Sequence, residues 1–358
     1  MLRSTLCPVA RCSADARSRR SGIGLGVAEH CAKLGMKICI ADLERQEAEM
    51  ADIEPMLTEM GAQGVMFHAT DVASYESVEA LRDAIYAKWD DVGFLFNNAG
   101  LGAGQAGFDG SWDASKQSLE NWRLVIDVDL FGVLHGQQAF IPTMLERGTE
   151  AVVVNTASAA GLSNTAYTPN GTTDMAYTVA KNGVTLLSES LNAAMRHREA
   201  PISVHVLCPF GTQSSMGLNT AKFHATGMDE ETRRKAVEMA EKRVQNNADA
   251  PGTGGQITAE SGARMLQECI EVGRFYCVTP DRTASTNTSR AWMLARAEDF
   301  IADNPPFTSA PGTPEFRELN RDVSGRSRGP IHRWDGPTDA PSPYAGRRIG
   351  EGEAKARL

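Results

Sequence analysis

The sequence lacks the features that mark several classes of protein. Its seven cysteines are scattered singly with no CxxC pair, so we expect no zinc site and no redox motif. No apolar run approaches the roughly 18 residues of a membrane-spanning helix, and no secretory signal core is present. Repeats of about 20 to 50 residues are also absent. We therefore expect no metal centre and no membrane partner.

The sequence also lacks an excess of basic residues. Its 36 lysines and arginines are outnumbered by 45 acidic residues, for a net charge of −9, whereas nucleic-acid binding needs a basic face. We therefore expect no nucleic-acid partner. Cys39, Cys208 and Cys277 lie inside apolar runs, which indicates core residues in a reducing compartment and predicts a cytoplasmic protein. The segment 1–20 is rich in arginine and nearly free of acids, a composition that mitochondrial presequences can also have.

What the sequence does contain is an alternation of short apolar segments with helical patterns. We expect strands at 37–41, 65–68, 94–96, 151–155, 202–207 and 275–278, and helices at 24–34, 44–60, 75–89, 119–147, 176–196 and 289–301. This alternation predicts an α/β fold in which helices cover both faces of a parallel sheet. The 358 residues, 42% of them apolar, suffice for one large domain with a sizeable core.

Two segments depart from the alternation. Residues 217–255 contain a polar helix at about 229–246 and a glycine-rich exit, and an insertion this long is more often a lid or binding loop than a connector. Eight of the 16 prolines follow Asn304, so we expect residues 305–358 to form a disordered tail. The domain itself would then span residues 22–304.

Tyr177 and Lys181, in the stretch YTVAK, are spaced by one helical turn and so share one face of a helix. A phenol with a pKa of about 10 is a poor acid or base at neutral pH. A nearby ammonium group stabilises the phenolate and lowers that pKa, which makes the pair a candidate proton shuttle. The same spacing is common on solvated helices, so the pair by itself does not decide the function.

Ser158 follows an apolar strand in the stretch VVVNTASAAG. Open α/β sheets bind their ligands at the carboxyl ends of parallel strands, so the Ser158 hydroxyl could hold a substrate oxygen beside the tyrosine. Residues 97–100, NNAG, also follow a strand, and small residues there let the backbone approach a ligand. Both stretches also fit ordinary turns.

Three glycines, Gly22, Gly24 and Gly26, precede and open a helix, where backbone N–H groups can meet a phosphate. Asp42 ends the next strand, at the distance from Gly22 where the dinucleotide-binding fingerprint expects an acid. A carboxylate there can accept hydrogen bonds from a ribose diol and repel a 2′-phosphate. Asp71 follows the third strand and could receive an adenine amino group. Both aspartates could instead serve as plain helix caps.

In order, GIGLG, the AD at 41–42, the DV at 71–72, NNAG, NTASAAG and YTVAK resemble the short-chain dehydrogenases/reductases of the YxxxK type. The resemblance covers about Gly22 to Ile301. It implies a single domain with a Rossmann-type, doubly wound parallel sheet that binds NAD or NADP. It also implies hydride transfer between a nicotinamide and an alcohol or carbonyl group. A homodimer or homotetramer, formed through the helices at 119–147 and 176–196, is a further implication.

The resemblance also implies a role for each matching residue. Tyr177 would be the general acid/base, Lys181 would lower its pKa and hold the nicotinamide ribose, and Ser158 would polarise the substrate oxygen. The cofactor would be lined by Gly22, Ile23, Gly24, Asp42, Asp71, Val72 and Asn98, together with Tyr177 and Lys181. Among these, Asp42 resembles the acid that selects NAD.

The segment before Gly22 departs from the family pattern, which is usually Thr-Gly-x-x-x-Gly-x-Gly directly after a strand. The Thr-Gly positions fall on Arg17 and Ser18, and the strand would fall on Cys12–Ala16, which has no apolar run. We favour the interpretation that residues 1–21 are an atypical segment rather than the native beginning, so that the first strand is poor or missing. The alternative is a divergent strand within Leu6–Ala10.

Other departures affect the site more locally. Arg19 and Arg20 could contact a 2′-phosphate, which would favour NADP. Asp129 stands where the family usually has an asparagine that supports a water relay to the lysine; the added charge predicts an altered pH dependence rather than loss of activity. Phe210 replaces a usual glycine. The stretch of chain between Ser158 and Tyr177 is longer than the family norm, so we expect a bulge beside the substrate.

The sequence thus predicts an NAD-dependent oxidoreductase that interconverts a secondary alcohol and a carbonyl compound. Apolar residues in and beside the expected lid, Met216, Leu218, Phe223 and Met228, favour a small apolar alcohol or ketone as the substrate. Two alternatives stay open: an NADP-dependent carbonyl reductase and a non-catalytic cofactor-binding protein. The second has no need for Ser158, Tyr177 and Lys181 together.

Overall fold

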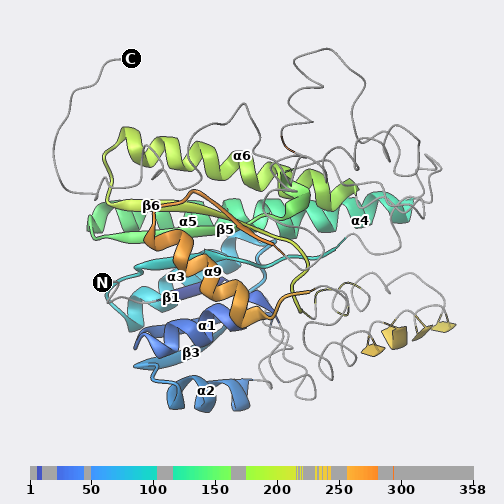
Figure 1. Cartoon of the computed structure of the whole chain (residues 1–358), viewed down its shortest axis with the longest axis horizontal. Helices are drawn as coiled ribbons and strands as arrows, with labels where there is room; N and C mark the ends of the chain where they lie inside the picture. Colours follow the sequence, from blue (N-terminus) through green and yellow to red (C-terminus); the bar gives the residue numbers. More distant parts are fainter. Residues whose placement is uncertain are drawn as a thin grey trace, which may run out of the picture.

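The computed structural model describes residues 6–9, 22–43, 50–102, 116–162, 175–214 and 256–280, with scattered residues from 216 to 242 and residue 293. Within this part of the chain, seven parallel strands form one sheet in the order β3-β2-β1-β4-β5-β6-β7 (Figure 1). The chain builds outward from β1 in both directions, so the sheet is the doubly wound Rossmann type that the sequence predicted.

The elements follow the expected alternation closely. The strands are β1 (Leu6–Val9), β2 (Lys37–Asp42), β3 (Gly64–Ala69), β4 (Phe94–Asn97), β5 (Ala151–Thr156), β6 (Ile202–Pro209) and β7 (Tyr276–Thr279). The helices are α1 (Ile23–Lys33), α2 (Met50–Glu59), α3 (Tyr75–Lys88), α4 (Lys116–Ile126), α5 (Gly132–Arg147), α6 (Met175–His197) and α9 (Ala259–Glu271). A π-helical turn (Asp127–Phe131) joins α4 to α5, and a 3-10 turn (Ala159–Gly161) follows β5.

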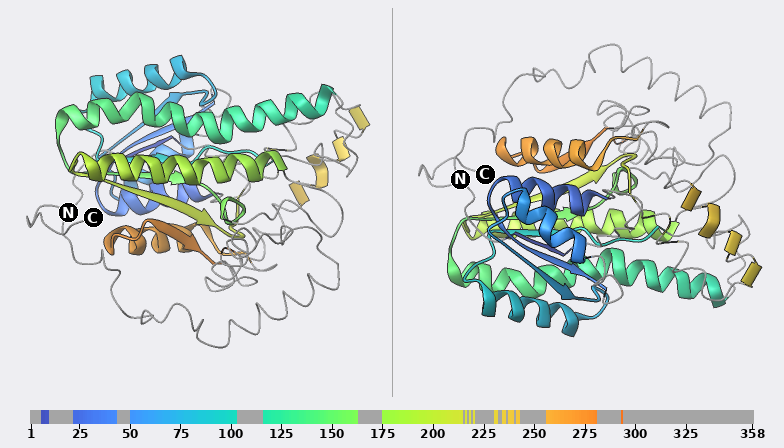
Figure 2. Two further views of the ribbon diagram at one scale, coloured as in Figure 1. Left: turned by 90° about the horizontal axis from the view of Figure 1, so that it is seen from above. Right: turned by 90° about the horizontal axis from the view of Figure 1, so that it is seen from below.

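Helices cover both faces of the sheet (Figure 2). One face carries α3, α5 and α6, whereas α1, α2 and α9 cover the other. β5 is buried along its whole length, as expected for a parallel strand covered on both sides. This layering leaves the carboxyl edge of the sheet as the place where the ends of several strands meet.

β1 corrects the expectation that the first strand is missing. It lies between β2 and β4, with Leu6 in register with Ile38 and Phe94. The structure therefore follows the alternative interpretation, a divergent strand within Leu6–Ala10. The family pattern pointed to a strand directly before Gly22, whereas residues 10–21 separate β1 from that glycine. Pro8 cannot donate a backbone hydrogen bond, which is unusual for a strand that is paired on both sides.

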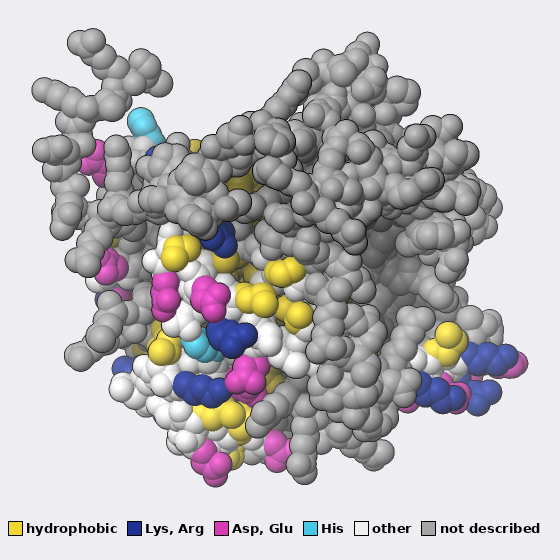
Figure 3. Space-filling view, in the orientation of Figure 1, with side chains coloured by type: hydrophobic (Ala, Val, Ile, Leu, Met, Phe, Trp, Pro, Cys, Tyr) yellow, Lys and Arg dark blue, Asp and Glu magenta, His cyan; other side chains and the backbone are white. Residues whose placement is uncertain are grey.

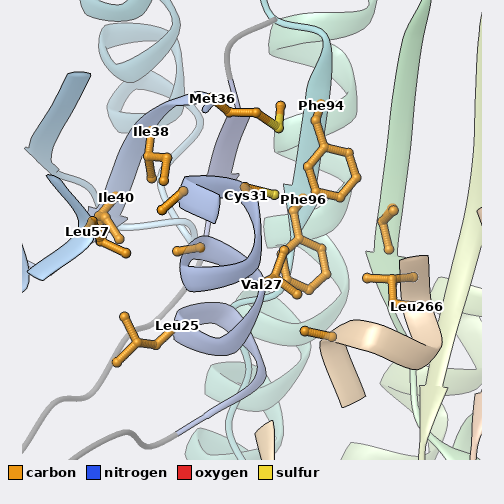
Figure 4. Packing of buried hydrophobic residues seen from close by; sticks show 14 of the residues in the cluster. Leu25, Val27, Cys31, Met36, Ile38, Ile40, Leu57, Phe94, Phe96 and Leu266 are labelled. Atoms are coloured by element: carbon orange, nitrogen blue, oxygen red, sulfur yellow. The ribbon is translucent and has the colours of Figure 1, made fainter. Parts of the chain in front are cut away.

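The core beneath α1 explains why this helix carries small residues. Val27 and Cys31 point toward Phe94 and Phe96 of β4, whose rings stack with centroids 6.1 Å apart (Figure 4). A Cβ atom on Gly26 would lie 2.7 Å from the carbonyl oxygen of Ala259, closer than real Cβ contacts come. Gly26 therefore lets α9 pack directly against α1.

α9 is a helix that the sequence analysis missed. Thr258 caps it, its hydroxyl accepting a hydrogen bond from the Ser261 backbone N–H at 3.2 Å. Its buried residues, Ala259, Gly262, Ala263, Leu266 and Cys269, recur at helical spacing. The signal was therefore present, but the small residues Ala and Gly make such a stripe hard to recognise as a core-facing helix.

The single helix expected at 119–147 is interrupted by the π turn at 127–131. The stretch Trp122–Arg147 is long and apolar enough to span a membrane by length and composition alone, yet 56% of its most apolar window is buried inside the fold. Its α5 part packs against α3 and β4, and its start at α4 packs against α6. Packing within the domain therefore accounts for its apolar character.

Several predictions fall outside the described residues. They are most of the lid at 217–255 with its polar helix, most of the last helix at 289–301, the tail at 305–358, and Arg17, Ser18, Arg19 and Arg20. At the end of β6, the Phe210 N–H donates to the Thr279 carbonyl at 3.0 Å, so Phe210 continues the pairing with β7. Cys39, Cys208 and Cys277 are buried, which confirms them as core residues.

The described surface carries charges of both signs. On the face seen in Figure 3, basic and acidic side chains lie among apolar ones in the central described region, and basic side chains also gather over the described helical residues between 230 and 242. There Lys235 pairs with Glu231 at 2.6 Å, and Lys242 pairs with Glu238 at 2.8 Å.

Candidate active site

α6 brings together the tyrosine and lysine that the sequence singled out. Lys181 is 2% exposed, and its Nζ donates to the carbonyl oxygen of Thr156, at the end of β5, at 3.0 Å. The same Nζ lies 5.6 Å from the centre of the half-buried Tyr177 ring. The predicted pair therefore shares one face of the helix, and that face meets the carboxyl end of a central strand.

Asp129 reaches Lys181 from a π-helical turn, in which the helix is wider than an α-helix. It sits in the π turn, is fully buried, and places Oδ2 3.3 Å from Lys181 Nζ. Its Oδ1 accepts a hydrogen bond from the Leu101 backbone N–H at 2.7 Å. Single π turns inside α-helices are frequent at functional sites because the extra residue redirects a side chain. The predicted site residue Asp129 is thus brought into direct contact with Lys181.

Gly100 makes this contact possible. A Cβ atom at this position would lie 3.3 Å from both Asp129 Oδ2 and Lys181 Nζ, tighter than most real contacts. The glycine that ends NNAG therefore has a clear steric reason in this chain. It lets the loop after β4 lie against a buried ion pair. Removing one partner of such a pair leaves an uncompensated buried charge, which costs about 3–5 kcal/mol.

Ser158 lies directly after β5 and begins the 3-10 turn. It is 8% exposed, and its Oγ accepts a hydrogen bond from the Ala160 N–H at 3.2 Å. The residue thus serves as the cap of a short turn and also stands at the carboxyl edge of the sheet. The turn interpretation of Ser158 is therefore confirmed, and the Oγ atom that caps the turn keeps its own hydrogen as a donor.

Polar side chains at the ends of β4 and β5 form a network that the sequence analysis did not identify. Asn97 Nδ2 donates to Asn155 Oδ1 at 2.8 Å, and Asn155 Nδ2 donates to Ser188 Oγ at 2.9 Å. Thr156 Oγ1 donates to Asn98 Oδ1 at 3.0 Å, which fixes a residue predicted to line the cofactor. The sequence feature that could have indicated this network is the presence of polar residues at the ends of two apolar strands.

The first turn of α1 holds the predicted phosphate-binding residues. Gly22 is the N-terminal cap with φ +105°, a conformation that favours glycine, and nothing lies within 4 Å of where its Cβ would be. Ile23 and Gly24 follow in the first turn. The free N–H groups and positive end of the helix are suited to a phosphate.

Asp42 lies at the end of β2, and Asp71 and Val72 follow the neighbouring strand β3. Asp42 is 3% exposed, and its Oδ1 accepts a hydrogen bond from the Leu43 N–H at 2.8 Å. Asp71 is exposed, and its Oδ1 accepts from the Ala73 N–H at 3.0 Å in a tight turn, while Ser74 caps α3. The Val72 carbonyl is bonded by His135 at 2.8 Å. Asp71 therefore shapes the turn before α3, whereas the cap of that helix is Ser74 and not the aspartate.

These positions fit a dinucleotide. The sheet order puts the ends of β3, β2, β1 and β4 side by side, and with them Val72, Asp42 and Asn98, while Gly22 stands at the start of α1. Such an edge, at the point where strand order reverses, is where doubly wound folds bind dinucleotides. The arrangement combines Gly22 as the cap of α1, the buried carboxylate of Asp42, and Gly100, which lets the loop after β4 approach its neighbours closely.

A sequence model of the short chain dehydrogenase family matches residues 18–225. The chain belongs to this family. It is 26% identical over 212 residues to 3beta-hydroxysteroid dehydrogenase 2 of Eggerthella lenta, with 59% of this chain and 75% of that protein covered. It is 28% identical over 258 residues to 1-deoxy-11-beta-hydroxypentalenate dehydrogenase of Streptomyces exfoliatus, with 72% and 78% covered.

A solved relative supports the same conclusion. The crystal structure of a short-chain dehydrogenase/reductase from Burkholderia phymatum in complex with NAD matches with a TM-score of 0.65 and 28% identity, over 87% of this chain and 98% of that one. This short-chain dehydrogenase/reductase is therefore an oxidoreductase of a family that binds NAD(P)(H). Members act on small molecules and are typically oligomeric.

Proposed function

We propose that this short-chain dehydrogenase/reductase is a cytoplasmic, NAD-dependent enzyme that interconverts a secondary alcohol and a carbonyl compound by hydride transfer. The observation that carries the proposal is the placement of Lys181. Its ammonium group is held by Thr156 and Asp129 and lies 5.6 Å from the ring of Tyr177. A purely structural lysine would have no need of a tyrosine beside it at the ligand-binding edge of the sheet.

Each catalytic residue has one task in this proposal. The Ser158 hydroxyl donates a hydrogen bond to the substrate oxygen, and Tyr177 takes the alcohol proton or returns it to the carbonyl oxygen. Lys181 stabilises the Tyr177 phenolate by its charge, and Asp129 holds Lys181 in place. When bound, NAD supplies the nicotinamide ring that exchanges the hydride.

The preference for NAD rests on Asp42. A carboxylate at the end of β2 repels a 2′-phosphate and accepts hydrogen bonds from a ribose diol. Gly22, Ile23 and Gly24 would meet the pyrophosphate, while Asp71, Val72 and Asn98 would line the adenine and its ribose. The competing NADP-dependent reductase would use Arg19 and Arg20 for the 2′-phosphate.

The substrate we propose is a small apolar alcohol or ketone. Leu218 is 1% exposed and Met216 is 38% exposed. Their segment reaches the loop after β4, because Thr220 Oγ1 accepts a hydrogen bond from the Gly102 N–H at 2.9 Å. Two relatives are named for a hydroxysteroid and a hydroxypentalenate, which are alcohols on apolar ring systems. A cyclic secondary alcohol is therefore the first class to test.

The enzyme is proposed to be a homodimer or homotetramer through the helices at 119–147 and 176–196. Leu119, Phe131, Val179 and Leu186 are exposed by 51%, 42%, 50% and 64% on these helices, which pack side by side. Clustered exposed apolar side chains mark protein interfaces. Leu186→Glu should reduce the mass seen by light scattering, whereas Leu34→Glu, at an exposed leucine on the other side of the sheet, should not. A wild type that is already monomeric would contradict the proposal.

The decisive experiment follows nicotinamide absorbance with cyclohexanol, 2-octanol, a 3β-hydroxysteroid and the matching ketones. Wild type should turn over at least one of them with NAD. Tyr177→Phe should lose about 10²- to 10⁴-fold in kcat because it cannot move the proton. Comparable rates in the two proteins would refute the mechanism. Calorimetric cofactor binding without any turnover would favour the non-catalytic alternative instead.

A further inference from the structure

The helix that carries Tyr177 and Lys181 also holds the turn that carries Ser158. Asn182 Nδ2 donates to the Ala160 carbonyl oxygen at 2.9 Å. One helical turn later, the Thr185 hydroxyl shares its single hydrogen between the carbonyl oxygen of Gly161 at 3.3 Å and that of Lys181 in its own helix at 3.1 Å. The bond from Lys181 Nζ to the Thr156 carbonyl oxygen precedes Ser158, and the bonds to Ala160 and Gly161 follow it. Hydrogen bonds therefore attach α6 to the backbone on both sides of Ser158.

The fit between α6 and this turn is close and directional. A Cβ atom on Gly161 would lie 2.5 Å from the Lys181 carbonyl oxygen, so only glycine lets the turn rest on the helix backbone. Asn182 Nδ2 also donates to the Thr178 carbonyl oxygen at 2.9 Å. Its two hydrogens are thus both used, which fixes the orientation of the amide.

Such lateral bonds matter because the chain between the two catalytic residues is long. The whole segment 159–176 separates Ser158 from Tyr177 in the sequence. An extended chain spans about 3.3–3.6 Å per residue, so a connection of this length is compatible with a wide range of distances between its ends. The distance between the serine and the tyrosine must therefore be set by contacts across the site.

We propose that Asn182, assisted by Thr185, is a positioning residue that sets Ser158 against Tyr177. This inference rests on the proposed function. Asn182 does not touch the substrate; it acts through the turn at 159–161. Misplacing a catalytic group by about 1 Å can cost as much as 10²-fold in rate. Losing the Asn182 bond should therefore lower kcat while leaving cofactor affinity unchanged.

The first test does not depend on activity. Hydrogen exchange is measured in Asn182→Ala and in Asn192→Ala, the same substitution further along α6. The amides of Ala160 and Gly161 donate to Ser158, so their exchange should become about tenfold faster in Asn182→Ala alone. Exchange in α3 should not change. Equal protection of the turn in both variants would overturn the proposal.

The second test is a double-mutant cycle, using the best substrate from the alcohol panel. Asn182→Ala should lower kcat about tenfold with an unchanged pH profile, and it should cost nothing further when Ser158 is already alanine. Additive losses would overturn the positioning role alone. A wild-type rate for Ser158→Ala would overturn the role of the serine, and this inference with it.

Thr185 provides a second pair of variants in case Asn182→Ala fails to fold. Thr185→Val keeps the shape and loses the hydroxyl, whereas Thr185→Ser keeps the hydroxyl. The serine variant should retain the wild-type kcat, and the valine variant should lose a few-fold, again only when Ser158 is present. Equal kcat values in the two variants would contradict an effect through the bond to Gly161.

Discussion

The two halves of the ligand-binding edge are built in different ways. Where β4, β5 and α6 meet, buried polar groups hold one another through the bonds from Asn97 to Asn155 and from Lys181 to Asp129. Where β1 meets α1, a short strand that contains a proline precedes Gly22, with residues 10–21 between them. The half around β4, β5 and α6 keeps the residues of the family pattern, except that Asp129 replaces an asparagine. The half around β1 and α1 keeps only the part of the glycine-rich turn that begins α1.

In the function that we propose, this difference separates the residues of the chemical step from those that bind the cofactor. In the β4–β5–α6 half each side chain is placed by several neighbours, so a single substitution there leaves a buried partner unsatisfied. In the β1–α1 half the order comes from pairing with β2 and β4 and from close helix packing. We expect changes in the first half to affect turnover and stability together, and changes in the second to affect cofactor choice or stability separately.

The largest effect is expected for Lys181→Met. It should lower kcat by at least about 10²-fold and the free energy of unfolding by about 3–5 kcal/mol, because Asp129 would be left charged and buried. Lys242→Met is the control, since Lys242 pairs with Glu238 at 2.8 Å on an exposed helix face and its loss should change little. Activity assays and urea unfolding measure both. Equal stability losses in the two variants would remove the contrast between buried and exposed pairs.

The next effect concerns the cofactor half. Asp42→Asn should lower the ratio of kcat/KM with NAD to that with NADP by about tenfold, because the 2′-phosphate would no longer meet a negative charge. Asp71→Asn is the matched control and should leave the ratio unchanged. A wild-type enzyme that prefers NADP would contradict the role given to Asp42 outright.

A smaller effect should appear in stability alone. Gly26→Ala should destabilise the fold by about 1–3 kcal/mol, because its Cβ would be forced against the Ala259 carbonyl. Gly262→Ala, on the facing helix with its nearest neighbours at 3.9 Å, should instead be neutral or stabilise by up to about 1 kcal/mol. Thermal unfolding distinguishes them. Similar shifts in both would mean that α1 and α9 are not in close contact.

The smallest effect on the reaction rate is expected for Asp129→Asn, although this variant leaves the buried Lys181 without its carboxylate and should lower the free energy of unfolding by about 3–5 kcal/mol. The variant keeps the acceptor for the Leu101 N–H but removes the charge beside Lys181. With its charge no longer offset, Lys181 stabilises the Tyr177 phenolate more strongly, so the limb of the pH–rate profile that Tyr177 sets should move to lower pH. This is the acidic limb for alcohol oxidation and the basic limb for carbonyl reduction. The maximal rate should stay within about tenfold of wild type. An unchanged profile would exclude this effect of the aspartate.

Most of the fold could be read from periodicity. The strands from β2 to β6 and the helices α1, α3 and α6 lie within a few residues of their predicted positions, because their apolar residues recur with the period of the element. β1 was proposed only as the less favoured alternative, and α9 was not found. LCPV is too short to have a period, and the buried face of α9 consists largely of alanine and glycine, whose burial depends on α1.

The same division holds for the site. Tyr177, Lys181, Ser158 and Asp42 could be proposed from the sequence because their joint order and spacing resemble one family, although none of them indicates a function alone. The contributions of Thr156, Asn155 and Asn182 were not, since a threonine carbonyl or an asparagine amide gains a role only from what lies opposite it. The π turn that aims Asp129 at Lys181 also has no periodic signature in the sequence.

The sequence by itself therefore determined the family, the layered α/β arrangement and the residues suited to move a proton. These depend on local patterns and on intrinsic chemistry. Only the tertiary structure decided that a short strand with a proline fills the centre of the sheet, that Asp129 pairs with Lys181, and that α6 grips the Ser158 turn. Each of these depends on contacts between segments far apart in the chain, where burial gives a hydrogen bond or an ion pair its consequence.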